Sequence, residues 1–361
     1  YWPHSRLAQM HLEDYGTFMM LVPLYLLLRQ FKFDFTCVIA LFALVAILLG
    51  LVSISQYVAM RYFNVQILTS DNAYSYFWLR PSGGVNPMRY GAVSLVLMVI
   101  AFNGVLLIRN KAMWLKLLLW VSSVMAGVAC YLADSRSSFL AVPVLAFMYS
   151  VYLYKAGHPR FLMMLLVSSV LLVAGLSQND RVKATLSSFE RYQQGDAVSS
   201  LGARLDMFKA AVILIEQKPI WGLGLGGYLE GGKEVRKMYP NIDQHVGTWS
   251  NPHNEYLLVM VEKGVIGLIT LLLLFAAPGY LFWQALKSAG DSRAGQKIKF
   301  YAMGGLSLLV VYAVVGLSVA LFQHDVFNHF FTLVVLLFAS QIRVIGYMGE
   351  RAVEESGRGL P

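Results

Sequence analysis

The sequence predicts an all-α polytopic membrane protein with about nine transmembrane helices and a large helical loop domain outside the cytoplasm. Hydrophobic residues make up 57% of the chain and charged residues only 14%, which is far more apolar than an ordinary soluble domain. The apolar residues gather into stretches long enough to cross about 30 Å of hydrocarbon. Basic residues, in turn, alternate between the loops that separate these stretches. Together these observations indicate a bundle of membrane-spanning helices.

The apolar stretches give the expected positions of the spans. They lie near residues 16–30, 33–55, 88–108, 113–133, 137–154, 160–177, 257–284, 300–322 and 326–346. Because the chain begins at Tyr1 rather than Met, we expect about three further spans before it and about twelve in the full protein.

The basic residues predict the orientation of the spans. Every second loop carries them, as does the segment after the last span, and the positive-inside rule places these parts in the cytoplasm. The net charge of +9 is therefore a topology signal rather than a sign of nucleic-acid binding. The outer loops are then 56–87, 134–136, 177–256 and 323–325.

This topology divides the chain into four parts. They are N-terminal transmembrane helices (1–176), a loop domain with amphipathic helices (177–256), C-terminal transmembrane helices (257–346) and a cytoplasmic tail (347–361). Cys37 and Cys130 fall in spans near opposite membrane faces, so we expect no disulfide between them.

The long outer loop is predicted to contain a helix between Arg204 and Pro219. Leu205, Phe208, Val212 and Ile215 recur at helical spacing there. This apolar face either packs on the outer leaflet or lines an entrance for a lipid substrate. The glycine-rich segment 221–227 that follows lacks the Gly-Lys-Ser/Thr ending of a phosphate loop, so we interpret it as a tight turn.

The strongest candidate for acid–base chemistry stands where this loop returns to the membrane, at Asn251-Pro252-His253-Asn254. Asn251 suits a helix N-cap and Pro252 the first helical position, which puts His253 in the first turn. There the helix dipole disfavours an imidazolium, so the ring is expected to stay neutral and to accept a proton as a general base. The structural alternative is a histidine that only caps the helix at the membrane interface.

Arginines on the outer face run against the positive-inside trend and are candidates for binding an anion. Arg136, Arg204 and Arg236 all lie there, and several guanidinium groups converging on one site suit a pyrophosphate. The alternative for Arg136 is an ion pair with Asp134. For Arg204 it is a pair with Asp206 or an anchor at the membrane surface.

His324, Asp325 and His329 form an ionisable cluster at the outer end of the last span. Such a cluster at the membrane is a functional hypothesis by default. The spacing matches no strong metal-ligand signature, so no metal site is predicted. Asp-x-Asp, Gly-x-Ser-x-Gly and Walker motifs are absent from the sequence, which leaves the chemistry to histidine and arginine.

The ordered set of motifs resembles the O-antigen ligase and polymerase superfamily over residues 130 to 330. The motifs are Ser135-Arg136-Ser137-Ser138, Arg204 through Pro219 to Gly222-x-Gly224, Asn251-Pro252-His253-Asn254-Glu255-Tyr256 and Glu262-x-Gly264-Val265-x-Gly267. The resemblance implies a glycosyltransferase of the Gram-negative inner membrane that works on the periplasmic side. Its donor would be an O-antigen glycan on undecaprenyl pyrophosphate, and its acceptor the lipid A core oligosaccharide. Membrane lipids are the other expected partners, and no nucleic acid or cofactor is expected.

The resemblance also assigns roles to individual residues. It carries the family's loop histidine to His253, the arginine that begins the loop helix to Arg204, the Ser-Arg motif to Arg136 and a further loop arginine to Arg236. We expect His253, Arg204 and Arg136 to be catalytic. Arg236, Asn251, Asn254, Asp325 and His329 are expected to bind the pyrophosphate or the glycan.

Other functions remain open at this point. An O-antigen polymerase or a protein O-oligosaccharyltransferase would share the motifs and differ in the acceptor. A lipid-linked glycan flippase or transporter would place its ionisable residues along a path near the bilayer midplane and would show inverted repeats. Here the polar residues gather on the outer side instead, which favours an enzyme.

Overall fold

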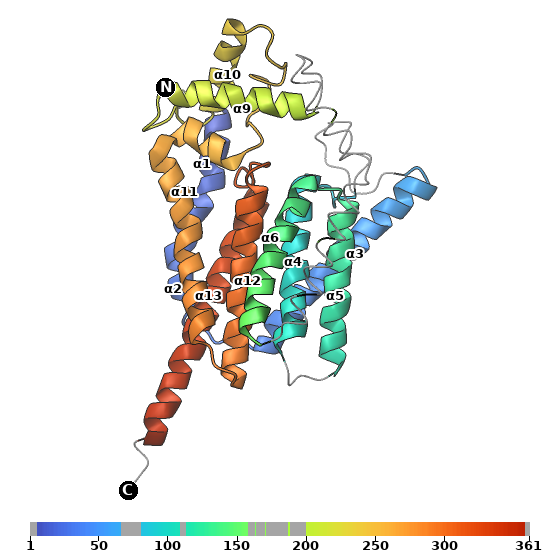
Figure 1. The fold of residues 1–361 in the computed structure, drawn as a ribbon, viewed down its shortest axis with the longest axis vertical. Helices are drawn as coiled ribbons and strands as arrows, with labels where there is room; N and C mark the ends of the chain where they lie inside the picture. The colour runs from blue at the N-terminus through green and yellow to red at the C-terminus, as the bar shows by residue number, and fades with distance from the viewer. Residues whose placement is uncertain are drawn as a thin grey trace. The chain divides into compact units, whose positions relative to one another are not determined.

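The structure is a computed structural model that describes residues 6–65, 81–108, 113–157 and 200–357, together with the single positions 163, 170 and 187. These described parts of the chain are helical and contain no strand (Figure 1). The predicted all-α class is therefore confirmed.

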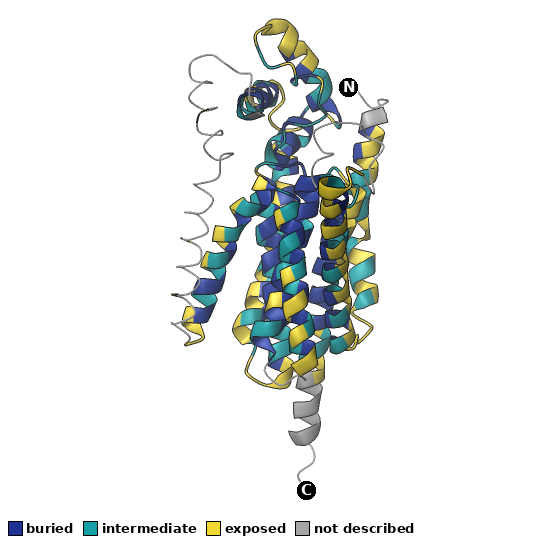
Figure 2. Ribbon diagram, turned by 90° about the vertical axis from the view of Figure 1, so that its right-hand side faces the viewer, coloured by how far each residue is buried: buried dark blue, intermediate teal, exposed yellow. Residues whose placement is uncertain are grey.

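Seven of the predicted spans are confirmed as helices long and apolar enough to cross a membrane, which makes this a multi-pass membrane protein. They are α3 (Phe35–Tyr62), α4 (Pro87–Leu107), α5 (Met113–Leu132), α6 (Arg136–Lys155), α11 (Glu255–Ser288), α12 (Arg293–Val315) and α13 (Asp325–Gly357). Exposed and buried residues alternate along the spanning helices (Figure 2). Many exposed ones are large and apolar, such as Leu48 on α3 and Leu273 on α11, as lipid-facing positions require.

Two predicted spans have a different outcome. Residues 16–30 do not form one long helix, because they are divided among the end of α1 (Arg6–Gly16), the 3₁₀ helix η1 (Thr17–Met20) and α2 (Leu21–Leu28). Pro23 lacks the amide hydrogen that would bond back to Met19, and the backbone tightens to 3₁₀ geometry just before it. Apart from positions 163 and 170, the span expected at 160–177 lies outside the described residues.

The chain forms two compact units. The first comprises Tyr1–Tyr15, Leu140–Leu274 and Val314–Gln323, and the second comprises Gly16–Phe139, Phe275–Ala313 and His324–Pro361. Each unit is described by itself below.

In the second unit, α3, α4 and α5 pack against one another, and α13 packs on α2 and η1. The bundle relies on small residues where the helices touch. A Cβ added to Gly50 would lie 2.7 Å from the Cβ of Met125 on the neighbouring helix. Such close approach is how helices associate in lipid, where apolar burial gives little driving force between them.

In the first unit, α9 (Ser200–Gln217) and α10 (Gly227–Met238) pack together, and α9 lies across the first turns of α11 (Figure 1). The helix predicted in the loop is thus confirmed, and the placement of its predicted apolar face, on the outer leaflet or along a lipid entrance, stays a prediction. Val212 is 48% exposed, and Leu205, Phe208 and Ile215 are only partly buried. The face that enters the core carries Ala203, Met207, Ala210, Ala211 and Leu214. The alanines of this face let neighbouring segments approach closely. Because α9 carries apolar residues on both sides, the periodicity of the sequence does not show which side enters the core.

The glycine-rich segment 221–227 is a tight turn, as predicted, and it supplies hydrogen-bond partners at a break in α11. Gly264 has a φ of 63°, which interrupts the α-helical hydrogen bonds at that point. The carbonyls of Val261 and Glu262 accept instead from the amides of Leu223 (2.8 Å) and Gly224 (2.9 Å). The amide of Val265 donates to Pro219 in return, at 2.9 Å.

Only glycine fits where these two backbones cross. A Cβ on Gly222 would lie 2.4 Å from the backbone carbon of Glu262, and one on Gly264 would lie 2.2 Å from the carbonyl oxygen of Ile220. The backbone groups freed by the kink thus find partners in the turn, as buried backbone requires. The Gly222-x-Gly224 and Glu262-x-Gly264 motifs are two halves of one structural element.

Candidate active site

The loop ahead of α11 does not have the predicted cap. The helix begins at Glu255, and Asn254 caps it, because its Oδ1 accepts from the amide of Leu257 at 3.0 Å. The Nδ2 of Asn254 also donates to the carbonyl of Leu317 at 3.0 Å. Asn251 was predicted as the cap, which is wrong. Its Oδ1 accepts instead from the amide of His253 at 3.0 Å, and this forms a short turn around Pro252.

His253 therefore stands just before the cap rather than in the first helical turn. The dipole argument for a neutral ring loses force, since that effect falls off within the terminal turn. The backbone of His253 is left-handed, with a φ of 54°. A residue with a side chain pays about 1–2 kcal/mol for this conformation, and such strain gathers at functional sites.

An aromatic stack of rings holds the side chain of His253. Its ring lies edge-on to Trp249 with the ring centroids 4.7 Å apart, and Trp249 lies edge-on to His245 at 4.4 Å. The Nδ1 of His245 is 2.5 Å from Oδ1 of Asp243. A carboxylate that orients an imidazole is the arrangement of a general base and its partner, so His245 is a candidate that sequence analysis missed. The Asp-x-His spacing of residues 243–245 was the available signal.

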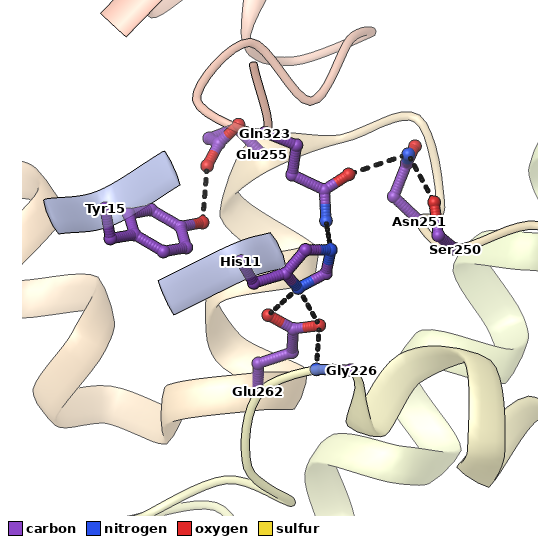
Figure 3. A network of polar contacts seen from close by, with 8 residues as sticks. All are labelled: His11, Tyr15, Gly226, Ser250, Asn251, Glu255, Glu262 and Gln323. Carbon is purple, nitrogen blue, oxygen red and sulfur yellow. Dashed lines mark hydrogen bonds and ion pairs between the residues drawn. The ribbon is translucent and has the colours of Figure 1, made fainter. Parts of the chain in front are cut away.

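A buried polar network joins this loop to α1 (Figure 3). The Nδ1 of His11 lies 3.1 Å from Oε1 of Glu262, and the Nε2 of His11 lies 2.9 Å from Nε2 of Gln323. The Oε1 of Gln323 accepts from Nδ2 of Asn251 at 2.8 Å. Oε1 of Glu262 also accepts from the amide of Gly226 at 2.9 Å. His11 and Glu262 are 251 residues apart, so sequence alone gave no reason to pair them.

Glu255 makes a second link between the same segments. The hydroxyl of Tyr15 donates to Oε1 of Glu255 at 3.4 Å (Figure 3). The amide of Phe322 donates to Oε2 of Glu255 at 3.1 Å. Burial, reinforced by the negative charge of Glu255, raises the pKa of Tyr15 well above its usual value. The phenol therefore stays protonated and acts as a donor.

The loop arginines lie on α9 and α10 in the first unit. Arg204 is partly buried on α9 and Arg236 is exposed on α10. A guanidinium nitrogen of Arg236 donates to the carbonyl of Gln244 at 3.0 Å, next to His245. Asp206, the alternative partner considered for Arg204, accepts from the amide of Asp243 at 3.0 Å and lies 3.6 Å from the ammonium of Lys209.

Arg136 belongs to the second unit and is exposed at the first residue of α6. The serines around it are buried and hold the turn on α4. Ser135 donates to the carbonyl of Met88 at 3.2 Å, and Ser138 donates to Ser135 at 2.9 Å. The positive end of a helix disfavours a cation and favours an anion. An anion at this point would be attracted by both the helix end and the guanidinium.

His324, Asp325 and His329 also lie in the second unit, at the start of α13. Nδ1 of His329 donates to the carbonyl of Asp325 at 2.6 Å, and both residues are exposed. Partial desolvation, together with the charge of Arg89, lowers the pKa of His324 to about 4 against the opposing effect of Asp325. Among the residues that the structure describes, no group of three His, Cys, Asp or Glu side chains lies close enough together to hold a metal ion.

The predicted site residues thus fall into two sets. His253, Asn251, Asn254, Arg204 and Arg236 belong to the first unit, and Arg136, Asp325 and His329 belong to the second. Within the first set, the structure brings Asn251, His253 and Asn254 into one hydrogen-bonded loop, and it adds His11, Gln323, Trp249 and His245 around them.

Comparison with known proteins finds a family model that matches part of the chain. Residues 121–272 match the family model described as O-antigen ligase. That segment contains Arg136, Arg204, Arg236 and His253, and it leaves out His11 and Gln323. A curated relative, an uncharacterized protein of Haemophilus influenzae, is 27% identical over 180 residues, which is 47% of this chain. The match covers 44% of that relative's length.

Proposed function

We propose that this multi-pass membrane protein, whose residues 121–272 match the O-antigen ligase family model, transfers O-antigen glycan from undecaprenyl pyrophosphate to the lipid A core oligosaccharide. The observation that carries the proposal is this family match, because the matched segment contains Arg136, Arg204, Arg236 and His253. The strained backbone of His253 and its ordered surroundings support a chemical role for that residue.

The proposal places the protein in the Gram-negative inner membrane with its active site on the periplasmic side. Basic residues between the spans favour this orientation. The helices α9 and α10 then belong to a periplasmic loop domain. Both lipid-linked substrates would reach the site through the membrane rather than from bulk water.

The chemistry we propose is a single displacement at the anomeric carbon of the donor sugar. The bond from that carbon to the pyrophosphate oxygen breaks, and the acceptor hydroxyl oxygen forms a new bond to the same carbon with inversion. Undecaprenyl pyrophosphate leaves with the bonding electrons on its terminal phosphate oxygen, and arginines stabilise the charge that develops there. His253 accepts the hydroxyl proton as general base. Neither a metal nor a cofactor takes part in this scheme.

Each predicted residue has a place in the scheme. Arg136 and Arg204 are assigned to the pyrophosphate because a guanidinium matches phosphate oxygens with two parallel hydrogen bonds. Arg236, Asp325 and His329 are assigned to substrate binding. Asn251 and Asn254 hold the His253 loop through the hydrogen bonds described above, which narrows their expected role from binding substrate to shaping the loop.

The proposal is tested by in vitro transfer from a defined undecaprenyl-pyrophosphate glycan to purified lipid A core. We expect a glycan–core conjugate with the wild type, and a loss of about 100-fold in kcat/KM for Arg204→Ala. Lys237→Ala is a matched control, because Lys237 is an exposed cation of α10 paired with Glu234, and its activity should be unchanged.

Other results would replace the proposal. Glycan chains that lengthen without a core acceptor would indicate a polymerase, and transfer to a protein acceptor would indicate an oligosaccharyltransferase. Movement of the donor across vesicles without any transfer would indicate a flippase. Activity that is lost with a chelator and restored by one metal ion would remove the metal-independent scheme.

A further inference from the structure

The proposed chemistry leaves the most deeply buried ionisable pair of the first unit without a role. His11 is 3% exposed and Glu262 is 1% exposed. Burying an imidazole and a carboxylate is costly unless both are hydrogen-bonded. Each of them has the partners described above, and the contacts continue from His11 to the loop of His253 (Figure 3).

One end of this series of hydrogen bonds, at His253, fixes the direction of all of them. The backbone amide of His253 can only donate, so the atom of Asn251 that faces it must be the carbonyl oxygen. The amide nitrogen of Asn251 then points to Gln323 and meets its carbonyl oxygen. The amide nitrogen of Gln323 is left facing His11. The Nε2 of His11 must therefore be an acceptor that carries no proton.

The other end requires the same arrangement. Glu262 as a carboxylate can only accept, and it already accepts from the amide of Gly226. The nitrogen of His11 that faces it, Nδ1, must carry the ring proton and donate it. Both ends thus select one tautomer of His11, with hydrogen on Nδ1 and a lone pair on Nε2.

We infer that His11 is a positioning residue for His253. Its Nε2 lone pair orients the amide of Gln323, Gln323 orients Asn251, and Asn251 Oδ1 holds the amide of His253 in its left-handed conformation. Glu262 selects the same tautomer of His11 from the other end of this series of hydrogen bonds. The catalytic consequence rests on the proposed role of His253, but the structural consequence does not.

Two substitutions of His11 separate this role from simple packing. His11→Gln can place an acceptor where Nε2 stands, so it keeps the bond from Gln323. His11→Asn can place a donor where Nδ1 stands, so it keeps the bond to Glu262 and loses the bond from Gln323. The two variants leave the same kind of side chain in the same buried place. They differ in which hydrogen bond of residue 11 is kept, the bond from Gln323 or the bond to Glu262.

The direct readout is hydrogen exchange of the His253 amide, followed by mass spectrometry. Pro252 has no amide, which simplifies the assignment of this position. Loss of one hydrogen bond is worth about 0.5–1.5 kcal/mol, so we expect about 3- to 10-fold faster exchange in His11→Asn and an unchanged rate in His11→Gln. The amide of Gly226, bonded to Glu262, is the internal reference and should exchange at the wild-type rate in His11→Asn.

Turnover gives the second readout. Displacement of His253 should lower kcat by about 10-fold in His11→Asn, with KM for the donor within about twofold, and His11→Gln should restore kcat. If neither His11 variant folds, Gln323→Leu tests the same chain, and it should speed exchange of the His253 amide at least as much as His11→Asn. Equal exchange rates in His11→Asn and His11→Gln, or a wild-type rate in Gln323→Leu, would overturn the inference.

The inference and the proposed function can fail separately. Full activity of His253→Ala would remove the general-base assignment, while faster exchange of the His253 amide in His11→Asn would still support positioning. Conversely, an inactive His253→Ala with a wild-type exchange rate in His11→Asn would leave the base in place and remove the role of His11.

Discussion

The two loops that precede the spans α11 and α6 carry the principal candidate residues of the two units, and they are held in different ways. The loop of His253 is tied by side chains from α1, from the segment 316–323 and through the network to Glu262 on α11. The loop of Arg136 is tied to α4 through Ser135, which donates to a backbone carbonyl. In both loops small polar residues hold the backbone.

This difference predicts which substitutions should alter His253 and which should alter Arg136. His253 depends on residues that are far away in the sequence, so distant substitutions should alter it. Arg136 depends on Ser135, which reaches a backbone carbonyl of α4 that is 47 residues away, so substitution of Ser135 should alter it. The predictions below test this contrast, beginning with the largest expected effect.

The largest effect is expected from Gly264→Ala. A Cβ there would lie 2.2 Å from the carbonyl oxygen of Ile220, at a φ of 63°. Both backbones at the crossing would have to move, and we expect little folded protein, read as loss of the monodisperse peak in size-exclusion chromatography. Gly279→Ala is the control, since its Cβ would meet nothing closer than Leu309 at 3.6 Å. A normal peak for Gly264→Ala would contradict the role of the crossing.

The next effect concerns Arg136→Ala. We expect kcat/KM to fall by about 100-fold from the loss of a charge on the pyrophosphate, with a melting temperature close to that of the wild type because the side chain is exposed. Arg136→Lys should recover only part of the activity, since an ammonium lacks the guanidinium fork. A large fall in melting temperature would instead indicate a structural ion pair, such as the one considered with Asp134.

A smaller effect separates the two faces of α9. Met207 is fully buried, so Met207→Ala should lower the free energy of unfolding by about 2–4 kcal/mol. Val212 is 48% exposed, and Val212→Ala should change it by no more than about 0.5 kcal/mol. Thermal unfolding in detergent shows which of the two variants loses more stability. The reverse order would contradict the assignment of the Met207 face to the core.

Hydropathy predicted the spans well because a bilayer imposes a minimum length and excludes charge. The same rule fails for residues 16–30, where Pro23 and the 3₁₀ turn divide the segment. For α9, the sequence predicts the helix but not its inner face, because that face depends on which partners pack against it.

The candidate site follows the same pattern. His253, Arg136 and Arg204 could be named because they belong to motifs of fixed order, and Arg236 because it is a further arginine of the same loop. The cap could not, since both Asn251 and Asn254 suit it, and the choice depends on the carbonyl of Leu317, which lies 63 residues beyond Asn254. His11 and Gln323 were out of reach for the same reason, because their roles exist only once distant segments meet.

Comparison of two histidine variants in the transfer reaction tests the central claim most directly. Both rings flank Trp249, and only His253 is proposed to take the acceptor proton. We predict that kcat falls by about 100- to 10,000-fold in His253→Ala, whereas His245→Ala changes it by less than about 10-fold. A wild-type rate for His253→Ala, with the larger loss in His245→Ala, would contradict the account and move the general base to the Asp243–His245 pair.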